Sequence, residues 1–230
     1  MSFSLPDGAR MNVSNGENGA TSFYYYGYPD YEEMMFVKKC LNKGDLFVDV
    51  GANSGGWSLT CFGLGARAIA IEPIPSSFNR LSRNFDLNNN DMLKAMCIGV
   101  SDRVGELFFT NDADTANRIV DEPTDSTDKI KVTTLDSLLA SENPSIIKID
   151  VEGHELNVLR GASNVLKKES LRALIVETFR RANYQTENLH QIEGLLKLNN
   201  FYPVGYRPES GEVYDLGPSE GGQNTIFMKK

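Results

Sequence analysis

The sequence predicts an α/β protein in which a mostly parallel sheet carries helices on both faces. Three observations support this fold class. Short apolar runs alternate with segments of helical period from about residue 30 to about residue 200, which is typical of βαβ units. The apolar runs are continuous rather than alternating, as expected for strands buried on both faces. The length of 230 residues, 40% of them hydrophobic, allows one domain with a sizeable core.

The expected elements follow from these patterns in chain order. The first is a helix with an apolar face at Met34, Val37 and Leu41, which stops at Gly44. Apolar runs then predict strands at 46–50, 68–71, 95–100, 146–149 and 173–176, and further strand-like runs lie at 129–133 and 225–228. Helical spacing predicts three more helices, with apolar faces at Phe78, Leu81 and Phe85, at Leu156, Leu159, Ala162 and Leu166, and at Leu189, Ile192, Leu195 and Leu196.

Three segments interrupt the alternation. Residues 1–29 are rich in Gly, Asn and Ser, residues 111–128 carry six acidic residues and one Arg, and residues 207–223 are rich in Gly and Pro. We expect surface loops or lids, because strand-like runs resume directly after the second and third segments. Solvated loops without a role explain the same composition. The expected organisation is an N-terminal loop or cap segment, 1–29, and one domain, 30–230.

Charge and cysteine content narrow the class of protein. The 31 acidic and 23 basic residues give a net charge of -8, which argues against nucleic acid as a partner. Cys40, Cys61 and Cys97 have no CxxC spacing and lie among apolar residues, which predicts free, buried thiols. The sequence has no signal-peptide core and no apolar run of membrane-spanning length. We therefore expect a cytoplasmic protein.

A glycine-rich turn after the 46–50 strand is the strongest local signal of a binding site, since α/β sheets hold nucleotide-like ligands there. No Lys follows its glycines, which excludes a P-loop, and Asn53 stands where a dinucleotide fingerprint needs a second Gly after Gly51. Asp49 repels a pyrophosphate but attracts an ammonium group, by up to ~4 kcal/mol at ~4 Å and a dielectric of ~20. This favours S-adenosylmethionine over NAD, although Asp49 capping the turn is the simpler alternative.

Acidic residues also follow the next two strands. Glu72 lies 21 residues beyond Gly51, a spacing at which an acid accepts hydrogen bonds from both ribose hydroxyls of an adenosine. NAD enzymes share this signal. Ser101 and Asp102 end the third strand, where they could hold an adenine amino group or form an ordinary turn.

Several titratable side chains follow the fourth strand, 146–149. Asp150 is expected to point into the cleft between cofactor and substrate. His154 could take a proton from a substrate hydroxyl, or simply face water. A metal held by residues 150–155 is an alternative, because a His with carboxylates can bind a divalent ion. Four ligands within six residues of one turn do not converge easily, so we predict no metal.

Taken together, these residues resemble the FkbM-type methyltransferases. The resemblance covers about residues 28–230 and rests on four motifs, which are Asp49 to Gly55, Glu72 to Pro75, Thr134 to Asp136 and Lys148 to Glu155, with Val158 to Ala162 after the last. It implies a class I methyltransferase Rossmann-like fold with a seven-stranded, mostly parallel sheet, whose last strand, 225–228, is antiparallel.

The resemblance also implies an activity and a set of roles. The activity is O-methylation of a sugar or secondary-metabolite hydroxyl by S-adenosylmethionine, with S-adenosylhomocysteine as the product. The implied cofactor residues are Asp49, Gly51, Asn53 and Gly55 for the methionine portion, Glu72 for the ribose, Ser101 and Asp102 for the adenine, and Asp150 beside the methyl-transfer centre.

For the chemistry we expect an in-line displacement, in which the site aligns a substrate hydroxyl with the sulfonium methyl. His154 is the favoured base, with Asp150 orienting it or the substrate, and Glu177 is a third candidate. The alternatives are a ribose 2′-O-methyltransferase, in which Lys148 and Asp150 flank the hydroxyl, a non-catalytic module that binds S-adenosylmethionine, and an NAD oxidoreductase. The acceptor and the oligomeric state stay open.

Overall fold

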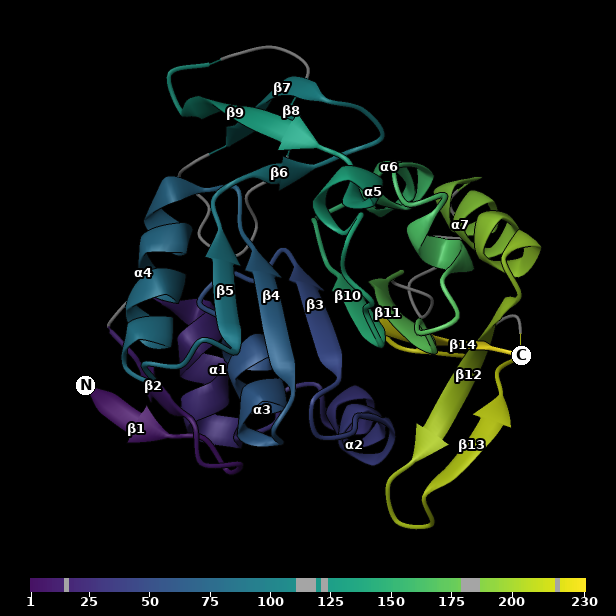
Figure 1. The fold of residues 1–230 in the computed structure, drawn as a ribbon, viewed down its shortest axis with the longest axis horizontal. Helices are drawn as coiled ribbons and strands as arrows, with labels where there is room; N and C mark the ends of the chain where they lie inside the picture. The colour runs from purple at the N-terminus through teal and green to yellow at the C-terminus, as the bar shows by residue number, and fades with distance from the viewer. Residues whose placement is uncertain (15–16, 111–118, 121–123, 179–186, 218–219) are drawn as a thin grey trace.

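The computed structural model contains one large sheet with the predicted α/β character (Figure 1). It describes all residues except 15–16, 111–118, 121–123, 179–186 and 218–219. The sheet order is β13-β12-β14-β11-β10-β3-β4-β5. Its strands are β3 (Leu46–Val50), β4 (Arg67–Ile71), β5 (Leu93–Met96), β10 (Ile146–Ile149), β11 (Ala173–Glu177), β12 (Phe201–Arg207), β13 (Glu212–Asp215) and β14 (Asn224–Lys229).

Strand directions confirm a mostly parallel sheet. β11, β10, β3, β4 and β5 pair in parallel, whereas β14 is antiparallel to both β11 and β12. The prediction of seven strands is off by one, because β13 adds an antiparallel strand to the edge beside β12. Residues 207–223 were expected to be a loop, and β13 lies within them. The cross-strand partner of Tyr214 is Gly205, which has no side chain, so the Tyr214 ring packs over it and under Arg207.

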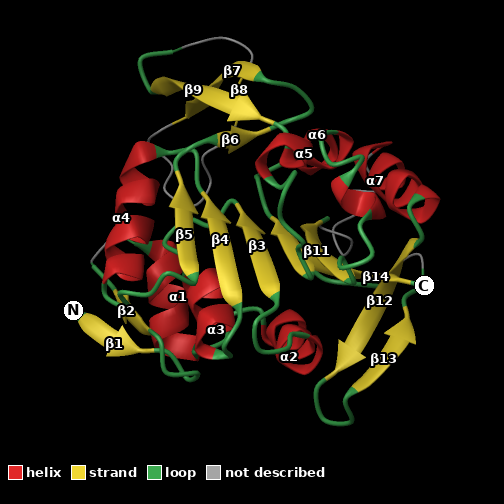
Figure 2. Ribbon diagram, in the orientation of Figure 1, coloured by secondary structure: helices red, strands yellow, loops and turns green. Residues whose placement is uncertain are grey.

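Helices cover the two faces of the sheet (Figure 2). The helices are α1 (Asn18–Tyr26), α2 (Tyr31–Cys40), α3 (Gly56–Gly63) and α4 (Pro75–Asp86) on one face, and α5 (Leu135–Leu138), α6 (Glu155–Arg160) and α7 (Glu187–Leu198) on the other. Each face of the sheet has its own hydrophobic core, and alternate residues of β3 point into one or the other. Phe47 packs with the first group of helices and Val48 with the second. This explains why the strand sequence is continuously apolar.

The strand expected at 95–100 is wrong in its length, because the chain leaves the large sheet after β5. Gly99 and Val100 form β6, the first strand of a second sheet with the order β6-β9-β7-β8. Its other strands are β7 (Gly105–Thr110), β8 (Ile119–Val120) and β9 (Thr127–Thr133). Because Gly99 has no side chain, β6 packs closely against Val132 and Phe109, and these contacts stabilise the departure of the chain from the large sheet. The small sheet lies over the carboxyl ends of β3, β4 and β5 (Figure 1).

The loop predicted for residues 1–29 is wrong in its secondary structure. β1 (Ser2–Ser4) and β2 (Arg10–Asn12) form a hairpin, and α1 follows. Packing overrides the poor local propensity, since Met11, Ala20 and Phe23 are buried in the core and Phe23 fills the space that Gly56 leaves open.

Two smaller expectations concern cysteines and loops. The three cysteines are free, as predicted, but only Cys61 is buried, whereas Cys40 is half-buried and Cys97 is exposed where the chain leaves the large sheet. The acidic segment expected to be a loop at 111–128 falls mostly on residues 111–118 and 121–123, outside the described residues, and contains β8.

None of the helices in the described part of the chain has the length and apolar character that a membrane span requires.

Candidate active site

A cavity of about 320 Å³ lies at the carboxyl ends of β3, β4 and β10. Six predicted site residues line it, namely Asp49, Gly51, Asn53, Glu72, Asp150 and His154. The small sheet contributes Phe109 and Ile119, and the N-terminal segment contributes Phe23. The cavity therefore has polar groups at the strand ends and an apolar wall opposite them, which suits an adenosine-like ligand.

The glycine-rich turn is folded as the residue types require. Gly51 has φ 82° and Gly55 has φ 88°, backbone conformations that favour glycine. A Cβ atom on Gly51 would lie 1.8 Å from the carbonyl oxygen of Asp150, and one on Gly55 would lie 2.5 Å from Leu81. Because neither residue has a side chain, Leu81 packs directly against the turn at Gly55, and the end of β10 approaches the turn closely at Gly51.

Asp49 presents one unsatisfied carboxylate oxygen in the cavity. Only 1% of the residue is exposed, and its Oδ2 accepts a hydrogen bond from Ser58 Oγ at 2.8 Å. The other oxygen, Oδ1, is buried without a hydrogen-bond partner among the described residues. Burial raises the pKa of Asp49, and the ammonium group of Lys148 opposes that shift. A buried acceptor without a partner can accept a hydrogen bond from a bound donor such as an ammonium group.

Glu72 is buried, yet both of its oxygens are hydrogen-bonded. They accept from the backbone N–H groups of Asn53 and Ile74, each at 2.9 Å. Burial raises the pKa of Glu72 to about 7 despite these two bonds. The backbone donors fix the carboxylate in one orientation, and each oxygen keeps a lone pair for a further donor from the cavity.

Lys148 is a buried cation beneath the site. Its Nζ lies 2.6 Å from Asp150 Oδ2 and 5.7 Å from the centroid of the Trp57 ring, and the residue is 3% exposed. Burial alone would lower the pKa of Lys148, but the carboxylates of Asp150 and Asp49 raise it above its usual value. Trp57 Nε1 in turn donates to Asp30 at 2.9 Å. Lys148 therefore holds Asp150 in a fixed position.

Both ring nitrogens of His154 already have partners. Nε2 lies 2.9 Å from Ser101 Oγ, and Nδ1 lies 3.1 Å from Asn157 Nδ2. Because the Asn157 amide N–H donates, we assign the proton to Nε2, which then donates to Ser101. Desolvation lowers the pKa of His154, so the neutral form prevails. The Nδ1 lone pair, which a general base would use to take a proton, is thus occupied by the Asn157 amide.

Four of the predicted residues, Gly55, Ser101, Asp102 and Glu177, are not part of the cavity lining. Ser101 lines a smaller neighbouring cavity with His154, and Asp102 accepts a hydrogen bond from Ser101 Oγ at 3.1 Å. Gly55 lies behind the turn. The adenine role expected for Ser101 and Asp102 is therefore not tested by this arrangement, and it stays a prediction.

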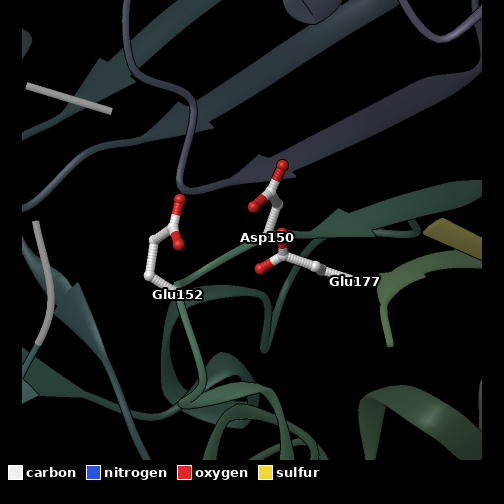
Figure 3. Close-up of side chains that lie close together, drawn as sticks. All are labelled: Asp150, Glu152 and Glu177. Carbon is white, nitrogen blue, oxygen red and sulfur yellow. The ribbon is translucent and has the colours of Figure 1, made fainter. Parts of the chain in front are cut away.

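Three carboxylates gather where β10 and β11 end, and two of them, Asp150 and Glu152, line the cavity. One oxygen each from Asp150, Glu152 and Glu177 lies within 4.8 Å of the others, and Figure 3 shows the side chains converging. We call these residues the carboxylate cluster. The parallel register of β10 and β11 pairs Ile149 with Val176, so the residues that follow, Asp150 and Glu177, come to lie side by side. Burial, followed by the charge of Asp150, raises the pKa of Glu177 to about 8.

Sequence reasoning missed the polar group opposite the carboxylate cluster. Asn224 pairs with Glu177 across β14 and β11 and lines the cavity. It is 6% exposed, and its Oδ1 has no hydrogen-bond partner in the described part of the chain. An Asn at the start of an otherwise apolar strand was the available signal.

Comparisons with known proteins bear on the family. The model of the methyltransferase FkbM domain matches residues 49–203. The chain is 35% identical over 136 residues to hexuronic acid methyltransferase AglP of Haloferax volcanii, covering 58% of this chain and 55% of the relative. It thus spans about half the length of that relative. It is 28% identical to methyltransferase sdnD of Sordaria araneosa, covering 74% of this chain and 80% of the relative.

Solved structures bear on the fold alone. Precorrin-6y C5,15-methyltransferase of Geobacter metallireducens superposes with a TM-score of 0.53 at 10% identity, covering 96% of this chain and 94% of that one. Fibrillarin of Aeropyrum pernix, solved with natively bound S-adenosyl-L-methionine, gives 0.52 at 13% identity, with 99% and 92% covered. The fold is that of the class I methyltransferases.

Proposed function

Because this chain belongs to the FkbM methyltransferase family, we propose that it is an S-adenosylmethionine-dependent O-methyltransferase acting on a hydroxyl of a sugar or secondary metabolite. The observation that carries the proposal is the orphan oxygen of Asp49, which is buried in the cavity beside the glycine-rich turn. A carboxylate in that position fits a ligand with a cationic amino group and rejects a pyrophosphate.

The other residues of the cavity fit the rest of the cofactor. Glu72, held by two backbone N–H groups, is placed to accept hydrogen bonds from ribose hydroxyls. Val100, Phe109 and Ile119 form apolar walls against which a flat base can pack. Bound S-adenosylmethionine would supply a methyl group on a sulfonium, which passes to the acceptor oxygen while the bonding electron pair stays on sulfur.

We assign the acceptor end of the site to the carboxylate cluster. Asp150 lines the cavity and is held by Lys148, so it is placed to orient the acceptor hydroxyl and to receive its proton. His154 is less well placed as the base, because both of its nitrogens are already hydrogen-bonded. Proximity and orientation supply the remaining rate acceleration.

The sugar acceptor is supported by the resemblance to the hexuronic acid methyltransferase. The net charge of -8 argues against RNA, the acceptor of the alternative ribose 2′-O-methyltransferase. Polar groups of the site, namely the carboxylate cluster, Asn224 and Gln223, suit an acceptor with several hydroxyls.

Calorimetry and a transfer assay test the proposal together. We expect the protein to bind S-adenosylhomocysteine and not NAD, and to transfer labelled methyl from S-adenosylmethionine to a member of a panel of hexuronic acids, neutral sugars and polyketide alcohols. Binding of NAD in place of S-adenosylhomocysteine would overturn it. Tight S-adenosylhomocysteine binding without transfer to any acceptor would favour a non-catalytic module, and transfer to structured RNA would favour the ribose alternative.

A further inference from the structure

We propose that the carboxylate cluster and the side-chain oxygen of Asn224 form a binding site for one hard divalent cation, such as Mg²⁺ or Mn²⁺. This reverses the prediction of no metal made from the sequence. The site would lie at the acceptor end of the cavity.

The spacing of the oxygens fits one ion. Metal–oxygen distances are about 2.1 Å for Mg²⁺ and up to about 2.6 Å for Ca²⁺, so ligand oxygens on opposite sides of one ion are about 4 to 5 Å apart. The three oxygens of the carboxylate cluster all lie within 4.8 Å of one another. They come from two neighbouring strand ends and the following turn, so the large sheet fixes their separation.

Asn224 is an observation independent of the acids. Its Oδ1 is buried and has no partner among the residues described, and the antiparallel register places it directly opposite Glu177. Glu177 Oε2 is likewise buried without a partner there, while Gln223 Nε2 holds Oε1 at 2.9 Å. Burying two acceptors costs free energy unless a donor or a cation satisfies both.

The charge balance points the same way. Within the described residues, the ion pair that reaches the carboxylate cluster is Lys148 with Asp150, so Glu152 and Glu177 have no ion-pair partner among those residues. Carboxylate and amide oxygens without sulfur or imidazole select hard ions of the Mg²⁺, Mn²⁺ and Ca²⁺ group. The one other acid of residues 150–155 is engaged elsewhere, because Glu155 accepts from the backbone N–H groups of Val151 and Gly153.

The ion would give the acceptor end a specific task, and this part of the inference rests on the proposed function. A bound cation coordinates the acceptor hydroxyl oxygen, holds it beside the transferred methyl group and lowers its pKa, so that a carboxylate suffices to take the proton. A second hydroxyl or a carboxylate of a sugar acid could occupy another coordination position. The site thus favours acceptors that carry two neighbouring oxygens.

Electron paramagnetic resonance of Mn²⁺ tests the site without an activity assay, since bound Mn²⁺ loses the sharp signal of the free ion. The metal-stripped protein is titrated with Mn²⁺ alone, and S-adenosylhomocysteine affinity is measured on the same samples. Glu177→Gln removes a ligand charge but keeps the shape and the bond from Gln223. Glu209→Gln, at an exposed position, is the matched control.

We expect one Mn²⁺ per chain, with binding weakened at least about tenfold in Glu177→Gln and unchanged in Glu209→Gln. Asn224→Ala should weaken it by a smaller factor. Equal Mn²⁺ binding by Glu177→Gln and Glu209→Gln, or no binding by the wild type, overturns the site. If Mn²⁺ does not bind but S-adenosylhomocysteine does, the site falls and the proposed function stands. If Mn²⁺ binds at the cluster but S-adenosylhomocysteine does not, the site stands and the proposed function falls.

Discussion

The acids at the two ends of the cavity are arranged in opposite ways. At the cofactor end, Glu72 accepts hydrogen bonds from two backbone N–H groups and Asp49 accepts one from the Ser58 hydroxyl. Asp49 lies on β3, whereas Glu72 directly follows β4. At the acceptor end, the acids of the carboxylate cluster face one another.

The difference indicates which kind of ligand each end can bind. Glu72, already fixed by the backbone, can accept from neutral donors such as ribose hydroxyls without moving, and Asp49 keeps one acceptor oxygen for an ammonium group. Acids that crowd one another are destabilised until a positive charge arrives. Four substitutions or titrations, in order of decreasing expected effect, test this contrast.

The largest effect is expected where the two ends touch. Gly51→Ala would bring a Cβ to 1.8 Å from the Asp150 carbonyl oxygen, at φ 82°. Gly44→Ala is the control, because Gly44 has φ 86° but nothing within 4 Å of the added atom. We expect a loss of about 1 to 2 kcal/mol in unfolding free energy for Gly44→Ala and about 3 kcal/mol or more for Gly51→Ala, measured by urea unfolding. Equal losses would mean that the turn yields and does not tie the two ends together.

The second effect concerns the charge at the cofactor end. Asp49→Asn keeps the shape and the bond from Ser58, but it removes the negative charge beside the orphan oxygen. A hydrogen bond between charged groups contributes about 1.5 to 3 kcal/mol, so S-adenosylhomocysteine affinity should fall at least about tenfold, by calorimetry. Asp91→Asn, at an exposed position, should leave it unchanged. Undiminished affinity in Asp49→Asn would remove Asp49 from the ammonium site.

The third effect is a pH dependence at Glu72. Its pKa of about 7 lies above the usual 4.5, so the free protein loses stability from this group as pH rises through 7. Ribose hydroxyls donate to the carboxylate form, so S-adenosylhomocysteine affinity should rise about tenfold from pH 6 to pH 8, with proton release on binding. Calorimetry in buffers of different ionisation enthalpy measures the release.

A control is needed for that measurement, because other ionisable groups lie near Glu72 and interact with it. Arg80 lowers the pKa of Glu72, Asp49 raises it, and the Cys97 thiol responds to its charge. Glu72→Gln should bind with an affinity that is constant across the same pH range. Proton release that persists in Glu72→Gln would assign the titration to another group.

The smallest effect is expected at His154. If this residue only positions Ser101, then His154→Ala should lower kcat less than about tenfold, whereas Asp150→Asn should lower it by about a hundredfold or more, the usual worth of a general base. Steady-state kinetics with the acceptor found above measures both. A hundredfold loss in His154→Ala at unchanged S-adenosylhomocysteine affinity would return the role of base to the histidine.

Local sequence patterns were sufficient to predict the central strands of the large sheet. The runs at 46–50 and 146–149 became β3 and β10 residue for residue, because strands buried on both faces are apolar throughout. The run at 95–100 could not be divided from sequence, since β6 takes its partner from β9, more than thirty residues downstream. The fold of residues 1–29 likewise depends on distant packing partners, such as Gly56 under Phe23.

The candidate site was predictable in its cofactor half and not in its acceptor half. Asp49, Gly51 and Glu72 belong to motifs that can be read along one stretch of chain, and all three line the cavity. The carboxylate cluster depends on the register of β10 against β11 and β14, which the sequence does not display. Reasoning along residues 150–155 therefore grouped His154 and Glu155 with Asp150, although both are turned to other partners.

The chain contains one tryptophan, and its position has a practical consequence. Trp57 lines the cavity, stacks on Phe47 with an interplanar angle of 8°, and has the Lys148 ammonium group above its ring and Asp30 on its indole nitrogen. All indole fluorescence of the protein therefore originates at the junction between the two ends of the site. A ligand that covers the ring, or an ion that draws Asp150 away from Lys148, changes the quenching of that emission. The unlabelled protein thus carries a built-in optical sensor of its own occupancy.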